Sequence, residues 1–262
     1  MPALSPLLNP ALFAKDVATT PTRHGYGDAL VELGKENEHI VVLTGDLAES
    51  TRAHLFQKAF PQRFIECGIA EQNMMGIAAG LALSGKIPFV SSYATFSPGR
   101  SWDQLRVSVC YANANVKIAG AHTGVSVGPD GATHQALEDI AITRVLPNLV
   151  VVVPCDALET RKATIAFGAY VGPCYLRFTR EATPLITHED TPFTIGKTPV
   201  LRQGKDVTIA ACGPLLFQAL VAAETLSKRH HIEAEVLNCH TLKPFDEKTL
   251  IKSVEKTRAC VT

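Results

Sequence analysis

Residues 149–156, LVVVVPCD, contain an uninterrupted apolar run that ends at a proline. A run that is apolar on both faces is typical of a parallel strand covered by helices on both sides. Similar short runs recur at 40–46, 63–68, 87–93, 116–122 and 174–179, and segments with helical periodicity lie between them at 71–84, 100–113, 134–146 and 156–170. This alternation predicts an α/β fold with a doubly wound parallel sheet.

The second part of the chain repeats this pattern on a smaller scale. Thr, Pro and charged residues dominate the stretch before residue 207, which predicts a linker with one short edge strand. Strands at 207–213 and 233–239 and helices at 215–228 and 246–256 follow, and a third strand starts close to Thr262. We expect an N-terminal extension (1–20), a first domain (21–183), a linker (184–206) and a second α/β domain (207–262) that is incomplete.

Composition excludes several classes of protein. The 262 residues are 46% hydrophobic and 19% charged, with 25 Lys+Arg against 25 Asp+Glu, so neither a disordered chain nor a nucleic-acid-binding protein is expected. The longest uncharged helix-like stretch, 74–83, is too short to span a membrane, and no secretory signal is visible. We therefore expect a cytoplasmic protein. The seven cysteines include no CxxC pair, which argues against a structural metal site.

Polar side chains gather just after the predicted strands. In an open parallel sheet, ligands bind at the carboxyl ends of the strands, so these residues are candidates for a site. They include Asp46, Ser50, Glu71, the segment 93–96, His122, Asp130, His134 and Arg180. Two nearby carboxylates have simpler interpretations: Asp156 fits a helix N-cap with Glu159 completing a capping box, and Asp139 fits an ordinary polar helix position.

Glu71 is the most informative of these residues. In GIAEQNMMGIAAGLALSG it is a lone carboxylate at the start of a helix whose other faces are small and apolar. Such a helix can be buried on all sides, which suits a domain or subunit interface. Burial favours the protonated form of a carboxyl, which could then hold or donate a proton near neutrality. A glutamate in a first helical turn is also common for its interaction with the helix dipole, so both interpretations stay open.

Three separated motifs resemble one known family. GIAEQNMMGIAAGLA (68–82), ATFSPGRSWDQLR (94–106) and GVSVGPDGATHQALEDIAI (124–142) are similar to the pyrimidine-binding domain of transketolase, a thiamine diphosphate enzyme. The later part of the chain resembles the start of the transketolase C-terminal domain. The family's diphosphate-binding domain is not in this sequence, so the resemblance implies the C-terminal subunit of a split transketolase. An N-terminal partner subunit would then hold the diphosphate and Mg²⁺, with no metal ligand in this chain.

The resemblance also implies roles for individual residues. Glu71 matches the catalytic glutamate that hydrogen-bonds the aminopyrimidine ring, and Phe96 and Trp102 match aromatic residues that pack on this ring. His122, Asp130 and His134 match residues of the donor-sugar channel, with both histidines in catalytic positions. Arg23, Ser50 and Arg180 match contacts to the sugar phosphate. Gly99 stands where single-chain transketolases have a further aromatic residue, which predicts a looser pocket or a substitute side chain.

The implied activity is the transfer of a two-carbon ketol unit from a ketose phosphate to an aldose phosphate, as in pentose phosphate metabolism. Pyrimidine domains of this family associate with each other, so a heterotetramer is expected. IAEQ around Glu71 is equally similar to deoxyxylulose phosphate synthases and to β subunits of 2-oxo-acid dehydrogenases, whereas DGATHQALED favours transketolase. A catalytically silent assembly subunit is the alternative from a different class.

Overall fold

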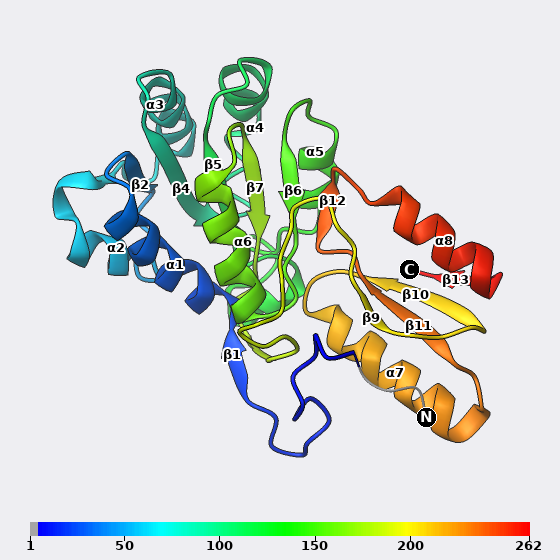
Figure 1. The fold of residues 1–262 in the computed structure, drawn as a ribbon. Helices are drawn as coiled ribbons and strands as arrows, with labels where there is room; N and C mark the ends of the chain where they lie inside the picture. Colours follow the sequence, from blue (N-terminus) through cyan, green and yellow to red (C-terminus); the bar gives the residue numbers. More distant parts are fainter. Residues whose placement is uncertain (1–4) are drawn as a thin grey trace.

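The computed structural model describes residues 5–262, so the first four residues of the expected N-terminal extension lie outside it. Its centre is a seven-stranded sheet with the order β12-β6-β7-β5-β4-β2-β3 (Figure 1). The strands are β2 (Ile40–Thr44), β3 (Phe64–Glu66), β4 (Ile87–Tyr93), β5 (Lys117–Ala121), β6 (Val150–Val152), β7 (Cys174–Arg177) and β12 (Thr241–Lys243). All neighbours pair in parallel except β12, which is antiparallel to β6. The predicted parallel sheet is confirmed.

Helices cover both faces of this sheet, and each face has its own apolar core. On one face, α1 (Thr22–Glu36), α2 (His54–Ala59) and α6 (Ala157–Ala169) pack around Tyr26, Phe56 and Phe167. On the other face, α3 (Glu71–Leu83) and the helix beginning at Trp102 pack around Met74, Met75 and Val109. Alternate residues of β2 enter opposite cores, Val42 the first and Val41 the second, as the period of a strand requires. The sheet is therefore doubly wound.

The second part of the chain forms a smaller sheet with the strand order β13-β10-β11-β9. Its strands are β9 (Val200–Arg202), β10 (Val207–Ala211), β11 (Ala234–Asn238) and β13 (Cys260–Val261), and α7 (Leu215–His230) and α8 (Glu247–Thr257) accompany them. Figure 1 shows this unit beside the edge of the large sheet where β12 lies. The expected edge strand in the linker is β9. A second short strand, β8 (Ala182–Pro184), pairs with β1 (Thr19–Pro21).

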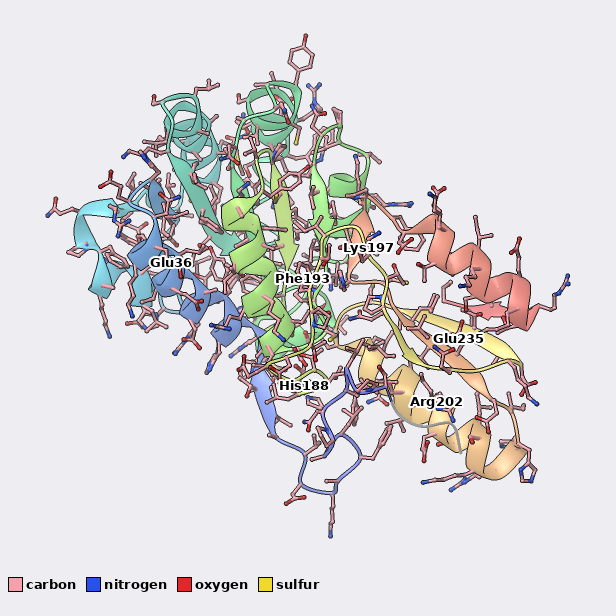
Figure 2. The ribbon with its side chains drawn as sticks, viewed as in Figure 1. Glu36, His188, Phe193, Lys197, Arg202 and Glu235 are labelled. Carbon is pink, nitrogen blue, oxygen red and sulfur yellow. The ribbon has the colours of Figure 1, made fainter. Side chains whose placement is uncertain are left out.

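The connecting segment and the N-terminal extension are packed against the two sheets. Leu8 and Leu12 are buried in the core of the smaller unit. The Thr191 hydroxyl donates to the Leu7 carbonyl at 2.7 Å, and the Phe193 ring lies 4.5 Å from the His240 ring. Figure 2 shows His188, Phe193 and Lys197 along this connection, which leads to the sheet that carries Arg202 and Glu235.

In residues 5–262 no helix is long and apolar enough to cross a bilayer.

Several elements differ from the predictions. The helix expected over 134–146 is confined to α5 (Asp139–Arg144), because the Ala136 carbonyl accepts from Gly124 at 2.9 Å and the segment forms a β-bridge with Thr123. The helix expected over 100–113 is α4 (Trp102–Gln104) followed by a π-helical segment, η2 (Leu105–Tyr111). The sequence pattern assigned no helix to the region of α1. The glycines of α1 weaken the helical pattern of the sequence. They are required by packing, since a Cβ added at Gly25 would lie 1.9 Å from the Ala157 carbonyl oxygen of α6.

Candidate functional site

The candidate site lies at the carboxyl edge of the large sheet. The segments that follow β2, β3, β4, β5 and β7 carry Ser50, Glu71, Phe96, His122 and Arg180. Arg23 lies in the first turn of α1, beside them. His122 directly follows β5 and adopts a left-handed backbone with φ of 53°. This conformation is uncommon for a residue other than glycine and turns the chain at the strand end. Sheet topology thus brings residues from distant parts of the sequence to one edge.

Glu71 is the first residue of α3 and is almost fully buried, with 1% of its side chain exposed. Its Oε2 accepts a hydrogen bond from Nη1 of Arg100 at 2.8 Å. Its Oε1 is buried and has no hydrogen-bond partner among the described residues. A buried carboxylate oxygen without a donor is costly to leave unmatched, so the position is suited to a ligand that brings a donor.

Phe96 and Arg100 lie on a tight loop between β4 and α4. The Tyr93 carbonyl accepts from the backbone N–H groups of Phe96 and Ser97, and the Phe96 carbonyl accepts from Arg100 at 3.0 Å. The Arg100 guanidinium lies over the Phe96 ring, 4.6 Å from its centroid. An added Cβ at Gly99 would be 2.2 Å from the Thr95 carbonyl oxygen. The loop therefore has no space for an aromatic side chain at position 99.

Four rings form a cluster next to this loop. Tyr93 stacks on His122 with centroids 4.1 Å apart and lies 5.9 Å from Phe96. His134 meets Phe96 edge-on at 5.3 Å. The structure thus brings together Phe96, His122 and His134, which were predicted as site residues from three separate motifs. Tyr93 was a candidate only as part of the polar segment 93–96, and the family resemblance gave it no role of its own.

Arg23 links the cluster to the segment after β2. Its Nη1 donates to the Ser50 carbonyl at 3.1 Å and lies 3.3 Å from Nε2 of His122. Because a guanidinium can only donate, Nε2 of His122 accepts and the ring proton belongs on Nδ1. Desolvation by burial, and then the charges of Arg23 and Arg180, lower the pKa of His122 to about 4. His122 is therefore neutral at pH 7, and its buried Nδ1 has no partner in the described chain.

Arg180 and Asp130 lie at the rim of the same region. Nη1 of Arg180 donates to the Val127 carbonyl at 2.8 Å and lies 3.5 Å from Asp130 Oδ1. The charge of Arg180 also lowers the pKa of Arg23, after desolvation as the larger cause. These two guanidinium groups repel each other, so an anion that contacts both would be bound favourably.

Trp102, which was predicted to pack on the cofactor, makes its hydrogen bond outside this cluster. Its Nε1 donates to the Ile142 carbonyl at 2.6 Å. The ring packs against the core on the α3 face of the large sheet, whereas Phe96 packs against the core on the α1 face.

Asp156 confirms the prediction of a helix cap. Its Oδ1 accepts from the backbone N–H of Glu159 at 2.8 Å. The predicted capping box does not form, because Glu159 Oε2 accepts at 2.7 Å from the backbone N–H of Cys155, one residue before the cap. Asp156 also holds the connecting segment, since its Oδ2 accepts from the backbone of Ile186 and Thr187.

The interpretation of Asp139 as an ordinary polar helix position was wrong. Asp139 is 1% exposed, and its Oδ2 accepts from Arg177 Nε and from the Tyr175 hydroxyl, both at 2.8 Å. The charge pattern of LEDIAITR gave no sign of this, because the partner residues lie on a strand more than thirty positions later.

In residues 5–262 no group of three or more His, Cys, Asp or Glu side chains is arranged to hold a metal ion.

The fold and the site together define a class. This is a doubly wound α/β domain with the candidate site at the carboxyl edge of its strands, joined to a smaller α/β domain. Residues 18–185 match the family described as transketolase, pyrimidine binding domain, and residues 196–262 match transketolase, C-terminal domain. The chain belongs to the transketolase family.

Individual relatives agree with this assignment. The chain is 47% identical over 88% of its length to a putative transketolase C-terminal section of Methanocaldococcus jannaschii, of which it covers 73%. It is 43% identical over 92% of its length to a 6-deoxy-6-sulfo-D-fructose transketolase subunit of Clostridium sp. (strain MSTE9), of which it covers 74%. A solved structure described as split gene transketolase, inactive beta4 tetramer, matches with a TM-score of 0.86 and 47% identity, covering 94% of this chain and 79% of that chain. The chain is a transketolase-type subunit, as its motifs implied.

Proposed function

We propose that this chain contributes the pyrimidine half of a thiamine diphosphate site and transfers a two-carbon ketol unit from a ketose phosphate to an aldose phosphate. Glu71 is the observation that carries the proposal. It combines near-complete burial with an Oε1 atom that has no partner in the described chain, and Arg100 connects its Oε2 to the partly buried ring of Phe96. A carboxyl in this setting can share a proton with a bound heterocycle.

The residues fit the cofactor that the family implies. A flat aminopyrimidine presents N–H donors and ring nitrogens at its edge and an apolar face above and below. Glu71 supplies the edge partner, and the Phe96 ring supplies a face for stacking. When bound, the cofactor supplies the carbanion chemistry of ketol transfer, and the protein orients it and sets its protonation state. Gly99 packs closely on the Thr95 backbone of the same loop and offers no side chain to the pocket.

His122, His134 and Asp130 are proposed to bind the hydroxyl and carbonyl groups of the donor sugar. His122 is suited to this role because it is neutral, with the pKa lowered to about 4 by burial and by Arg23 and Arg180. Its Nε2 is already engaged by Arg23, so its buried Nδ1–H is the group left to donate to a substrate oxygen. Removing a substrate hydroxyl would then leave a buried donor unpaired, which gives specificity for hydroxylated substrates.

Arg23 and Arg180, with Ser50, are proposed to bind the anionic end of the sugar. Arg180 is partly exposed, and its bond to the Asp130 carboxylate is long at 3.5 Å, so a phosphate can compete for it. The Clostridium relative is named for a sulfo-sugar, which also carries an anionic end group. A pair of guanidinium groups can donate hydrogen bonds to a sulfonate or to a phosphate, and we propose phosphate for this chain.

The remaining half of the site is proposed to come from an N-terminal partner subunit that holds the diphosphate and Mg²⁺. The relative described as an inactive beta4 tetramer supports self-association of chains of this type and inactivity without a partner. Two copies of each subunit then form the active heterotetramer, with the pyrimidine domains in contact.

The test is reconstitution with a matched pair of variants. The purified chain is mixed with its N-terminal partner, thiamine diphosphate and Mg²⁺, and ketol transfer from a ketose phosphate is measured. Glu71→Gln keeps the size of the side chain and removes the proton-sharing carboxyl, so we expect a loss of about 100-fold or more. Glu36→Gln, at the exposed end of α1, serves as the control and should retain full activity.

Three outcomes contradict the proposal. Equal activity of wild type and Glu71→Gln identifies a silent assembly subunit. Decarboxylation of a 2-oxo acid with dependence on a lipoyl partner identifies a dehydrogenase β subunit. Condensation of pyruvate with an aldose phosphate identifies a deoxyxylulose phosphate synthase-like enzyme.

A further inference from the structure

Arg100 occupies the space between the two groups that are proposed to hold the aminopyrimidine. Its Nη1 donates to Glu71 Oε2 at 2.8 Å, and its guanidinium carbon lies 4.6 Å from the centroid of the Phe96 ring. The guanidinium is therefore a flat group with an N–H edge on the glutamate and a face on the phenylalanine. These are the two contacts proposed above for a bound aminopyrimidine.

We propose that Arg100 is an internal substitute for the cofactor, which holds the pyrimidine site while the chain is without cofactor and leaves it when thiamine diphosphate binds. The inference rests on the proposed function, because it takes Glu71 and Phe96 as the pyrimidine site. A planar, weakly hydrated guanidinium is suited to this role, whereas the ammonium of a lysine is a compact point charge without a face.

The substitute stabilises the free chain. A carboxylate that is 1% exposed is unfavourable without a charged or hydrogen-bonding partner, and the described chain offers Glu71 no donor besides Arg100. The arginine therefore stabilises the folded subunit before it meets its cofactor. The bond does not satisfy both carboxylate oxygens, since Oε1 stays without a partner, so the site retains an attraction for a better-matched ligand.

The same contacts allow Arg100 to leave without a rearrangement of the loop. Its side chain is 49% exposed, and Glu71 is the only acceptor recorded for its guanidinium in residues 5–262. The loop backbone is held separately, by the bonds from Arg100 to Phe96 and from Gly99 to Ala94. Rotation of the side chain into solvent thus exposes the Glu71 carboxylate and the Phe96 ring while the loop keeps its shape.

The experiment compares Arg100→Met with Arg106→Met. Arg106 is a matched control, because it is equally exposed at 49%, pairs with Asp103 at 2.8 Å and also lies over an aromatic ring, that of Trp102. The dissociation constant of thiamine diphosphate is measured by titration of the reconstituted complex with Mg²⁺ present. The thermal midpoint of unfolding is measured on the chain alone without cofactor.

We expect Arg100→Met to bind thiamine diphosphate about fivefold more tightly, because the cofactor no longer has to break an ion pair. The thermal midpoint of the chain alone should fall by about 3 °C. Arg106→Met should change neither quantity. Arg100→Lys, which keeps the charge and loses the flat shape, should give intermediate values and provides the test if the methionine variant does not fold.

Two results overturn the inference in distinguishable ways. Unchanged or weaker cofactor binding by Arg100→Met, in a complex whose wild type binds thiamine diphosphate, shows that Arg100 supports the bound cofactor or is irrelevant to it, and leaves the proposed function intact. Absence of binding by the wild-type complex overturns the proposed function and this inference together.

Discussion

Arg23 Nη1 bridges the Ser50 carbonyl and the Nε2 atom of His122, at 3.1 and 3.3 Å. This contact joins the start of α1 to the segments after β2 and β5, and it determines which imidazole nitrogen carries the proton. The same burial and the same positive charges keep His122 neutral. The geometry of this arginine and histidine therefore sets both the shape and the hydrogen-bonding capacity of the proposed sugar channel.

The first prediction concerns the dependence of stability on pH. Burial, Arg23 and Arg180 lower the pKa of His122 from 6.5 to about 4, so the unfolded chain binds this proton more tightly than the folded chain. The contribution of His122 is therefore fully present above pH 6.5 and is lost as the pH falls towards 4. His122→Gln should reduce the loss of unfolding free energy between these pH values by about 3 kcal/mol. Urea denaturation across the pH range measures it.

His240 and His230 provide the comparison for this prediction. Burial also lowers the pKa of His240 to about 4, so His240→Gln should reduce the acid-induced loss by a similar amount. His240 packs on Phe193, away from the proposed site, so this variant should leave substrate binding unchanged. His230→Gln, at the exposed end of α7, serves as the surface control. A wild-type profile for His122→Gln would show that the histidine is not desolvated in solution.

The second prediction concerns Gly99, where the sequence suggested a looser pocket. An added Cβ would be 2.2 Å from the Thr95 carbonyl oxygen, so Gly99→Ala forces the loop backbone to move. We expect a loss of about 2 kcal/mol in unfolding free energy together with weaker cofactor binding, because Phe96 lies on the same loop. Gly76→Ala in α3 has open space around its Cβ and should instead be neutral or slightly stabilising. Calorimetric unfolding of both variants decides between these expectations.

The sequence predicted the first sheet well, because its strands are short buried runs whose pattern is local. It also predicted that Glu71, His122 and His134 lie at one edge of the sheet, which follows from the parallel topology. It did not predict α1, because Gly25 and Gly27 weaken a helix locally and are required only by close contacts with α6 and with Arg52. The π-helical segment and the antiparallel strand β12 also depend on tertiary packing that no local pattern reveals.

The third prediction concerns the buried network of Asp139. Its Oδ2 is shared by Arg177 and the Tyr175 hydroxyl, and this holds α5 on β7 directly after the loop that carries Asp130 and His134. Asp139→Ala leaves a mostly buried guanidinium without its partner, so we expect a loss of about 3 kcal/mol in unfolding free energy. Asp103→Ala, which breaks an exposed pair with Arg106, should cost less than about 1 kcal/mol. Chemical denaturation of the two variants measures the difference, and equal losses would contradict the structural role given to Asp139.

The fourth prediction separates Trp102 from Phe96. Resemblance assigns both residues to the cofactor, but the Trp102 indole donates to the Ile142 carbonyl at 2.6 Å and packs in the core opposite to that of Phe96. Trp102→Phe should therefore lower the unfolding free energy by about 1 kcal/mol through loss of this hydrogen bond and leave the dissociation constant of thiamine diphosphate within about twofold of wild type. Phe96→Ala removes the proposed stacking face and should raise the same constant about tenfold. Titration of the two reconstituted complexes gives the answer, and a comparable weakening by Trp102→Phe would return Trp102 to the cofactor site.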